Sequence, residues 1–348
     1  MAFVIRVPKD PETGYGLLSY SRGVLALDSP YPMIPVYNEE GWNVETPPEN
    51  ADTSFNDPAF YVVRVTAPEA LTLAAAGIEV ERRENGSRQV ATFAAGPARD
   101  FYLAGSEQYK VLEKTVGDTV VRSYAVESEE SQARVALNAA SDALTSFNRR
   151  FTPYPYSEME LAATPMLALG IEYPGVMGIT TNLYKEGGQS GGLPVEVAIL
   201  STVGHEVAHQ WFYNLIGSDQ VDEPWLDEAP AEYNGFLYYE RYLPDDTDWW
   251  WFYAVDQWAP AGKIDSILYL FRSNREYMDA VYRRGAQFMR DLRQVMGDPA
   301  FFGFLTEYQR RHAYRLTRSR DFFSLVQEYT TADLIPLQEE YFRQRILP

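Results

Sequence analysis

Hydrophobic and polar residues alternate along much of the first third of the chain, and this alternation predicts β-strands. The predicted strands are residues 60–67, 78–82, 88–93, 111–113 and 119–126. Asn85-Gly86 and Gly117-Asp118 interrupt the pattern and predict two hairpin turns. Residues 29–57, which precede these strands, are rich in Pro, Tyr and Asn, so we expect irregular loop there.

A helical period of three to four residues replaces the alternation after Ser128 and predicts a helix over residues 129–150. Pro194 opens another helix, which we expect to run to about residue 216 and to end at Gly217. The remaining predictions are strands at 158–164 and 176–182 and helices at 226–243, 248–258, 276–296, 299–312, 319–330 and 335–345. This order of elements predicts an α+β fold, with a β-rich N-terminal domain, 1–125, followed by a small sheet and a helical bundle, 126–348.

Composition narrows the chemistry that this fold can carry. The 348 residues include 30 Lys and Arg against 49 Asp and Glu, and the net charge of −19 repels phosphate backbones, so nucleic acid is not an expected partner. The chain has no cysteine, which excludes disulfides and thiolate metal ligands, and only three histidines. No apolar run reaches the roughly 18 residues of a membrane span, so no integral membrane segment is expected.

The N-terminus carries no recognisable secretion signal. We therefore expect a cytoplasmic protein if Met1 is the native start. An exported or surface-tethered protein is expected instead if upstream sequence has been removed.

One motif gathers two of the three histidines. His205-Glu206-Val-Ala-His209 lies inside the helix that Pro194 opens. Residues four apart on a helix share one face, so both imidazoles can reach the same ion, while Glu206 projects beside the ion rather than onto it. This spacing is typical of tetrahedral zinc with one open position and predicts one Zn²⁺ per chain.

A third ligand is expected from the next helix, and in a chain without cysteine it should be an oxygen donor. Eighteen residues separate His209 from Glu228, enough for the chain to turn and return antiparallel beside the metal. Pro230 fits such a helix only in its first turn. Glu232 lies one turn beyond Glu228 on the same face, where we expect it to accept a hydrogen bond from a ligand imidazole.

This ligand set predicts hydrolysis. Two neutral imidazoles and one carboxylate leave a net positive centre, which lowers the pKa of a bound water towards about 7. Glu206 can then take the water proton during attack on a carbonyl and pass it to the leaving amine. The resulting oxyanion needs a second donor, for which a tyrosine is expected, and the 25 tyrosines of the chain leave its identity open.

The stretch His205-Glu-Val-Ala-His209-Gln-Trp-Phe, followed by Glu228 after eighteen residues, resembles the zinc motif of the aminopeptidase N-type gluzincins. The further histidine of a metzincin is absent downstream of His209. Leu169-Gly-Ile-Glu-Tyr-Pro is similar to the family's exopeptidase motif, and Tyr282-Arg-Arg-Gly-Ala is similar to its catalytic tyrosine segment. The resemblance runs from about residue 20 to the end. It implies a zinc metallopeptidase with a thermolysin-like catalytic domain behind a β-rich N-terminal domain.

The resemblance also implies roles for single residues. The implied roles are zinc binding by His205, His209 and Glu228, proton transfer by Glu206 and oxyanion stabilisation by Tyr282. Tyr277 is the reserve candidate for the last role. Glu172 would bind the free α-ammonium group of a peptide, and the strand that contains Gly170 would pair with the peptide backbone. The implied substrates are peptides with a free N-terminus, trimmed one residue at a time.

The sequence departs from the family pattern at Leu169 and Tyr173-Pro174, where Gly and Asn are usual, and at Ala229-Pro230. The resemblance also implies a compact, bacterial-like member with a partial N-terminal domain and no C-terminal helical domain. Such a member would have a more open cleft that accepts longer peptides. Two alternatives stay open: an endopeptidase or non-peptide hydrolase on the same zinc site, and a peptide-binding scaffold without turnover.

Overall fold

The chain, analysed as a computed structural model, is described over residues 1–10, 15, 17–48, 53–190 and 193–347. It forms two compact units, each assembled from three separate stretches of sequence. Unit 1 comprises Met1–Ile34, Pro58–Leu144 and Pro155–Val207, and unit 2 comprises Pro35–Asp57, Thr145–Tyr154 and Ala208–Pro348. Strands dominate the first unit and helices the second, which confirms the α+β class. The domain boundary at residue 125 stays a prediction.

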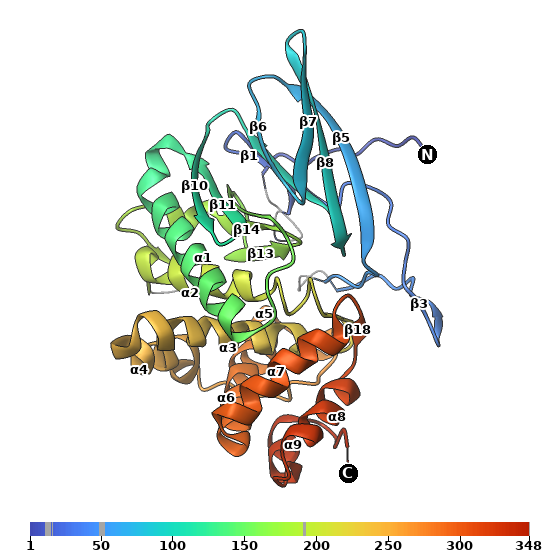
Figure 1. Cartoon of the computed structure of the whole chain (residues 1–348), viewed down its shortest axis with the longest axis vertical. Helices are drawn as coiled ribbons and strands as arrows, with labels where there is room; N and C mark the ends of the chain where they lie inside the picture. The colour runs from blue at the N-terminus through green and yellow to red at the C-terminus, as the bar shows by residue number, and fades with distance from the viewer. Residues whose placement is uncertain (11–14, 16, 49–52, 191–192, 348) are drawn as a thin grey trace. The chain divides into compact units, whose positions relative to one another are not determined.

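Two antiparallel sheets of unit 1 are built from residues before 107. One has the order β5-β8-β7, with bounds Ala59–Pro68, Arg88–Ala98 and Ile78–Asn85, and is seen in Figure 1. It confirms the three predicted strands and the hairpin between β7 and β8. The other has the order β1-β2-β9-β6, with bounds Leu18–Ser21, Val24–Asp28, Tyr102–Ser106 and Thr72–Ala75. The alternation does not reveal these strands, because each has only four or five residues.

A five-stranded sheet in unit 1 has the order β10-β11-β12-β14-β13. Its bounds are Tyr109–Val116, Thr119–Val126, Glu158–Thr164, Val176–Thr180 and Gly170–Tyr173. β12 runs parallel to β11 and β14, whereas β13 returns antiparallel to β14. The predicted second hairpin and the strands near 158 and 176 are confirmed. β13, which the periodicity does not reveal, lies at the edge of this sheet.

Helices α1 (Glu130–Arg150) and α2 (Val195–Ala208) begin in unit 1, and each crosses into unit 2 before it ends. The prediction for α1 is confirmed. The prediction that α2 extends to residue 216 is wrong, because the helix ends at Ala208. Short pairs of strands complete the description: β15–β16 at Gln189–Ser190 and Leu193–Pro194, β3–β4 at Tyr37–Asn38 and Gly41–Trp42, and β17–β18 at Gly217–Ser218 and Leu316–Thr317.

Unit 2 is largely helical (Figure 1). Its longer helices are α3 (Trp225–Tyr242), α6 (Arg284–Met296), α7 (Asp298–His312), α8 (Ser319–Tyr329) and α9 (Ile335–Tyr341). They confirm the predicted helices, although α9 ends four residues early. Pro230 was expected in the first turn of its helix, and this is wrong: α3 begins at Trp225, so the proline lies in the second turn.

Two predicted helices of unit 2 contain a π-helical segment. The helix predicted at 248–258 divides into α4 (Thr247–Trp250), the π-helix η5 (Trp251–Val255) and the 3₁₀ helix η6 (Asp256–Trp258). The helix predicted at 276–296 divides into α5 (Asn274–Tyr277), the π-helix η8 (Met278–Arg283) and α6. Hydrophobic periodicity does not distinguish π-helices from α-helices, and π-bulges are frequent at functional sites.

Further 3₁₀ turns of the two units are η2 (Glu127–Glu129), η3 (Thr181–Tyr184), η4 (Pro244–Asp246) and η7 (Leu268–Leu270).

The start of α3 is anchored in the aromatic core of unit 2. The buried ring of Trp225 meets Phe288, Phe322 and Phe342 edge-on, with ring centroids 5.6, 5.1 and 5.1 Å away. Its indole N–H donates a hydrogen bond to Ser319 Oγ at 3.0 Å. Because Trp225 is the first residue of α3, these contacts fix the turn that carries the next few residues, including two carboxylates.

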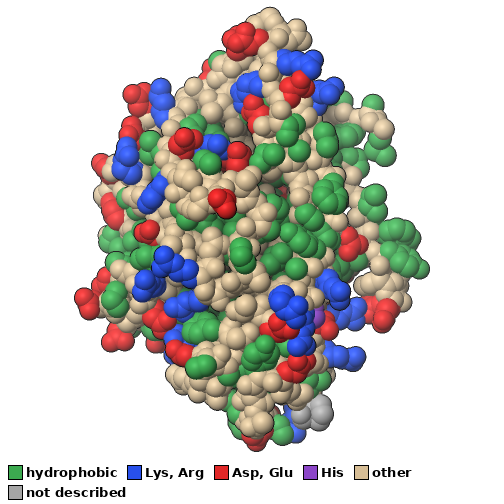
Figure 2. All heavy atoms as spheres, viewed as in Figure 1, with side chains coloured by type: hydrophobic (Ala, Val, Ile, Leu, Met, Phe, Trp, Pro, Cys, Tyr) green, Lys and Arg blue, Asp and Glu red, His purple; other side chains and the backbone are tan. Residues whose placement is uncertain are grey.

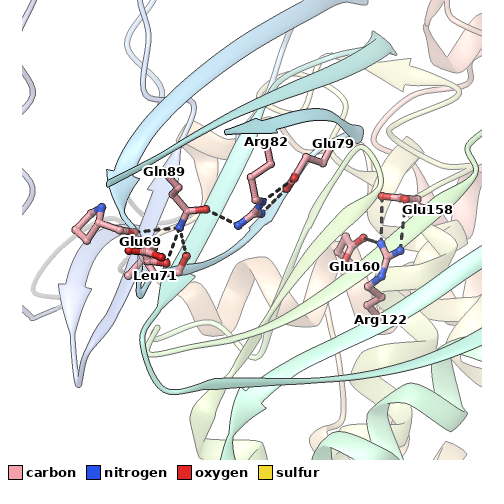
Figure 3. A network of polar contacts seen from close by, with 9 residues as sticks. Glu69, Leu71, Glu79, Arg82, Gln89, Arg122, Glu158 and Glu160 are labelled. Carbon is pink, nitrogen blue, oxygen red and sulfur yellow. Dashed lines mark hydrogen bonds and ion pairs between the residues drawn. The ribbon is translucent and has the colours of Figure 1, made fainter. Parts of the chain in front are cut away.

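Charged side chains of both signs are interspersed on the face that Figure 2 shows. One ion-pair cluster in unit 1 reaches the interior, and Figure 3 shows it: Arg122 on β11 bonds the carboxylates of Glu158 and Glu160 on β12. Burial raises the pKa of Glu160 to about 7, against the opposing effect of Arg122. Among the described residues, no helix is both long and apolar enough to cross a membrane.

Candidate active site

Helix α2 presents the paired histidines at its C-terminal end. His205 and Glu206 belong to its last turn, and His209 is the first residue after Ala208. The amide groups of Trp211 and Phe212 both bond to the Ala208 carbonyl, at 3.0 and 3.1 Å, and turn the chain away from the helix axis. The imidazoles therefore remain about one turn apart, although the helix does not continue.

The aromatic pair that follows the motif secures this turn within unit 2. Trp211 is buried, and its indole N–H donates a hydrogen bond of 2.7 Å to the Thr152 carbonyl. Its ring meets Phe147 edge-on at 5.8 Å, and the ring of Phe212 meets Phe151 at 5.7 Å. These contacts hold the backbone that follows His209. The Asn214 amide also bonds to the His209 carbonyl, so the backbone of His209 itself is fixed within the turn.

Two acceptors define the tautomer of His209. Its Nδ1 lies 2.6 Å from Asp227 Oδ1 and 3.0 Å from the Phe212 carbonyl, so this nitrogen carries the proton. Nε2 then presents its lone pair on the other side of the ring. Asp227 is only 1% exposed, and burial raises the pKa of its carboxyl, while His209 opposes the rise. A buried carboxylate on the rear nitrogen is the arrangement that orients a metal-binding imidazole.

Glu228 lies in front of that imidazole. Its Oε2 is 3.5 Å from His209 Nε2, and its Oε1 accepts a 2.5 Å hydrogen bond from the Tyr282 hydroxyl. The side chain is buried, so its charge is poorly solvated and favours a cation beside it. Tyr277, the reserve candidate, is buried and meets the ring of Tyr282 edge-on at 5.4 Å.

The approach of α3 to α6 brings Tyr282 to Glu228. Gly285, the second residue of α6, lies against Ala229: a Cβ atom added to Gly285 would be 2.5 Å from the Ala229 Cβ. Only glycine permits this crossing. Tyr282 lies three residues before Gly285, in the π-helix η8, and Glu228 precedes Ala229, so the same crossing aligns both side chains.

Unit 1 holds the remaining predicted residues. Gly170, the first residue of the edge strand β13, faces Glu206: a Cβ there would lie 2.1 Å from Glu206 Oε1. Glu172, two residues along β13, has a carboxylate oxygen within 4.8 Å of one of Glu206. Both carboxylates are buried, with 8% and 5% of their surface exposed. Two buried carboxylates this close favour a cationic partner or a shared proton.

The predicted residues thus form two sets, each within one unit: Gly170, Glu172 and Glu206 with His205 in unit 1, and His209, Glu228 and Tyr282 in unit 2. Asp227 was not predicted, although its position beside Glu228 is a signal that could have identified it. Asp227 accepts a hydrogen bond from the His209 imidazole, which is the role that the sequence predicts for Glu232. Glu232 is half-buried, and its role at a ligand imidazole stays a prediction.

Comparison with known proteins identifies the family of this chain. The model of the peptidase family M1 domain matches residues 135–341. Aminopeptidase M1-B of Oryza sativa subsp. japonica is 28% identical over 248 residues, 67% of this chain and 28% of the relative. Aminopeptidase M1 of Arabidopsis thaliana is 26% identical over 287 residues, 77% of this chain and 32% of the relative. Human endoplasmic reticulum aminopeptidase 1 is 28% identical over 230 residues, which are 62% of this chain and 24% of the relative.

The chain therefore spans about a third or less of the length of these relatives. The family model covers more than half of the chain and includes His205, Glu206, His209, Glu228 and Tyr282. The resemblance noted in the sequence is confirmed, and this chain belongs to peptidase family M1.

Proposed function

We propose that this chain is a zinc-dependent aminopeptidase that removes N-terminal residues from peptides. The observation that carries the proposal is the pair of buried carboxylates in unit 1. Glu172 lies within 4.8 Å of Glu206, so a group that binds an α-ammonium ion is adjacent to the candidate general base. A peptide whose amine meets Glu172 has its first peptide bond close to Glu206, since only one residue separates the amine from that bond.

The residues fit zinc. His209 presents Nε2 because its Nδ1 proton is held by Asp227, Glu228 supplies a buried oxygen beside that nitrogen, and His205 stands one helical turn earlier. Two nitrogen ligands and one oxygen ligand are a catalytic zinc set. Zinc, when bound, would polarise the substrate carbonyl and make water more acidic. The aminopeptidase names of the relatives support the same assignment.

The chain supplies the proton chemistry and the second oxyanion donor. Glu206 takes a proton from the attacking water and delivers it to the leaving amine. Tyr282 donates its hydroxyl hydrogen to the oxyanion as the carbonyl becomes tetrahedral. In the structure that hydroxyl bonds Glu228 at 2.5 Å, so its proton already points toward the proposed metal ligands.

Glu172 and β13 would set the exopeptidase mode. A buried carboxylate attracts an ammonium ion more strongly than an exposed one does, because little water screens the two charges. β13 is the edge strand of its sheet and runs from Gly170 to Tyr173, so an extended peptide can add to it as a further strand. The proposed partners are accordingly peptides with a free N-terminus.

The test compares free and N-acetylated forms of the same short peptide, with and without a zinc chelator. The proposal predicts turnover of the free peptide, loss with chelator, restoration by Zn²⁺, and near-complete loss on acetylation. Glu206→Gln should retain zinc and lose at least about 10²-fold in kcat. Equal turnover of acetylated peptide would instead support an endopeptidase, and stoichiometric zinc without hydrolysis of any peptide would support a binding scaffold.

A further inference from the structure

A series of hydrogen bonds, buried at His209 and half-buried at its far end, runs from His209 to Ser54 in unit 2. Asp227 accepts from His209 through Oδ1 and from the Gln220 amide through Oδ2. The Gln220 carbonyl oxygen accepts in turn from the backbone N–H of Ser54. Gln220 and Ser54 are 166 residues apart in sequence, and both lie in unit 2.

Each hydrogen bond in this series fixes the direction of the next one. Because the Ser54 N–H can only donate, it requires the carbonyl oxygen of Gln220 on its side. The NH₂ group of Gln220 must then face Asp227. With one donor on each oxygen, the Asp227 carboxylate cannot rotate away from His209. A flipped Gln220 would direct its oxygen at the carboxylate and lose both bonds.

Tyr213 holds Ser54 in place. Its hydroxyl hydrogen-bonds to Ser54 Oγ at 3.0 Å, and Asn56 Nδ2 donates to the same oxygen at 2.9 Å. Tyr213 has φ +124°, a backbone conformation that favours glycine and is strained for a bulky side chain. Such strain persists only where surrounding contacts enforce it. Here the side chain is buried, and the Tyr213 amide bonds to the Ile216 carbonyl at 2.9 Å.

We propose that Gln220 and Tyr213 are positioning residues for the proposed metal ligand His209, acting through Ser54 and Asp227. Ser54 then contributes to metal affinity without being one of the proposed metal ligands. This inference rests on the proposed zinc function, because it assigns His209 as a ligand. It goes further, since it names the contacts that fix the ligand's orientation and a residue distant in sequence, Ser54, on which they depend.

The test measures Zn²⁺ affinity by competition with a chromophoric chelator, separately from peptide hydrolysis. Gln220→Met removes the donor to Asp227 and the acceptor for Ser54, so zinc affinity should fall about tenfold, the lower end of the loss caused by removing a group bonded directly to a metal ligand. Gln338→Met is the matched control. Gln338 lies on α9 and is also buried. Its side-chain oxygen also accepts a hydrogen bond from a backbone amide, that of Ile346. The Gln338→Met protein should lose about as much thermal stability as Gln220→Met and keep its zinc affinity within about twofold of the wild-type value.

Tyr213→Phe is the second variant, because it deletes one hydroxyl and leaves the backbone unchanged. Its zinc affinity should fall by about twofold to fivefold, the effect of one hydrogen bond, whereas unchanged affinity would count against the inference. Tyr308→Phe is its control, since the Tyr308 hydroxyl also makes a buried bond in unit 2, to Thr317 Oγ at 2.9 Å. In the Gln220→Met background, Tyr213→Phe should have no further effect, because the connection is already broken.

Three outcomes would overturn the inference: unchanged zinc affinity in folded Gln220→Met, an equal loss in the Gln338→Met control, or additive effects of Tyr213→Phe and Gln220→Met. If Gln220→Met fails to fold, the Tyr213→Phe and Tyr308→Phe pair decides by itself. Failure of the proposed function has a different signature: wild-type protein that binds zinc without hydrolysing peptides, or hydrolyses them without zinc.

Discussion

Gly285→Ala is the substitution with the sharpest expected effect, because it acts where α3 and α6 meet. The added Cβ would lie 2.5 Å from the Ala229 Cβ and 3.0 Å from the Ala229 Cα. Carbon atoms in contact are about 3.5–4.0 Å apart. Both near atoms belong to a helix and cannot rotate away, so α3 and α6 must separate by roughly 1 Å.

The separation should affect catalysis more than stability. Overpacking of this kind costs about 1–3 kcal/mol, and the better helix propensity of alanine offsets about 1 kcal/mol of that. The free energy of unfolding should therefore fall by at most about 2 kcal/mol. Tyr282 and Glu228 flank the crossing and are joined by a 2.5 Å hydrogen bond. A misplacement of about 1 Å in a reacting group costs about 10²-fold in rate, so kcat should fall by about that factor.

The assay is kcat and KM for a free-amine peptide, together with urea unfolding of the same preparations. Gly303→Ala on α7 is the control, since its Cβ would meet only the Tyr329 ring, at 3.2 Å. It should retain kcat and unfold at an equal or higher urea concentration. A Gly285→Ala protein that is folded and retains kcat within about threefold would refute the argument that this crossing aligns Tyr282 with Glu228.

Three further predictions concern single side chains. Tyr282→Phe should lower kcat at least about tenfold with little change in KM, because its bond to the oxyanion forms mainly in the transition state; an equal rise in KM would contradict this. Glu228→Ala should release zinc to a chelator that the wild-type protein resists, as measured by equilibrium dialysis. Glu160, with its pKa raised from 4.5 to about 7, holds a proton in the folded state that the unfolded chain has lost between those pH values. The free energy of unfolding should therefore decrease as pH rises from 4.5 to 7, by about 3 kcal/mol, and Glu160→Gln should remove that slope in urea titrations.

Elements with a strong local pattern could be predicted from the sequence. β12 occupies residues 158–164 as expected, and α7 ends at His312 as expected. In both cases the residues that define the element are neighbours in sequence. The sheet β1-β2-β9-β6 could not be predicted in this way, because its strands are too short for a period to emerge. Arg22 and Gly23, both with positive φ, mark the turn between β1 and β2, but arginine gives no warning of it.

The error at the end of α2 has a different origin. Residues 209–216 contain no glycine or proline, so the sequence predicts that the helix continues to Gly217. The chain turns at Ala208 because Trp211 and Phe212 find aromatic partners in Phe147 and Phe151, about 60 residues earlier. Long-range packing decides this boundary against the local preference.

The residues of the candidate site also differ in whether a local sequence pattern predicts them. His205, Glu206, His209 and Glu228 follow from spacing, since helix geometry alone places residues four apart on one face. Tyr282, Glu172 and Gly170 needed the family resemblance, because one of 25 tyrosines and single positions on an edge strand have no distinguishing period. Asp227, adjacent to Glu228, could have been proposed as a carboxylate for an imidazole.

The contacts that orient His209 lie beyond the reach of any local pattern, and Tyr213 shows why. A tyrosine gives no sign that its backbone has φ +124°, and this conformation is unfavourable by itself. It exists because the turn after α2 needs a reversal at that point and because the hydroxyl reaches Ser54, from a segment predicted as irregular loop. The residues that bind the metal can therefore be read from their spacing. The residues that hold a metal ligand in one orientation are selected by the folded structure, and substitutions at Tyr213 or Gln220 should affect zinc affinity although neither side chain is a ligand.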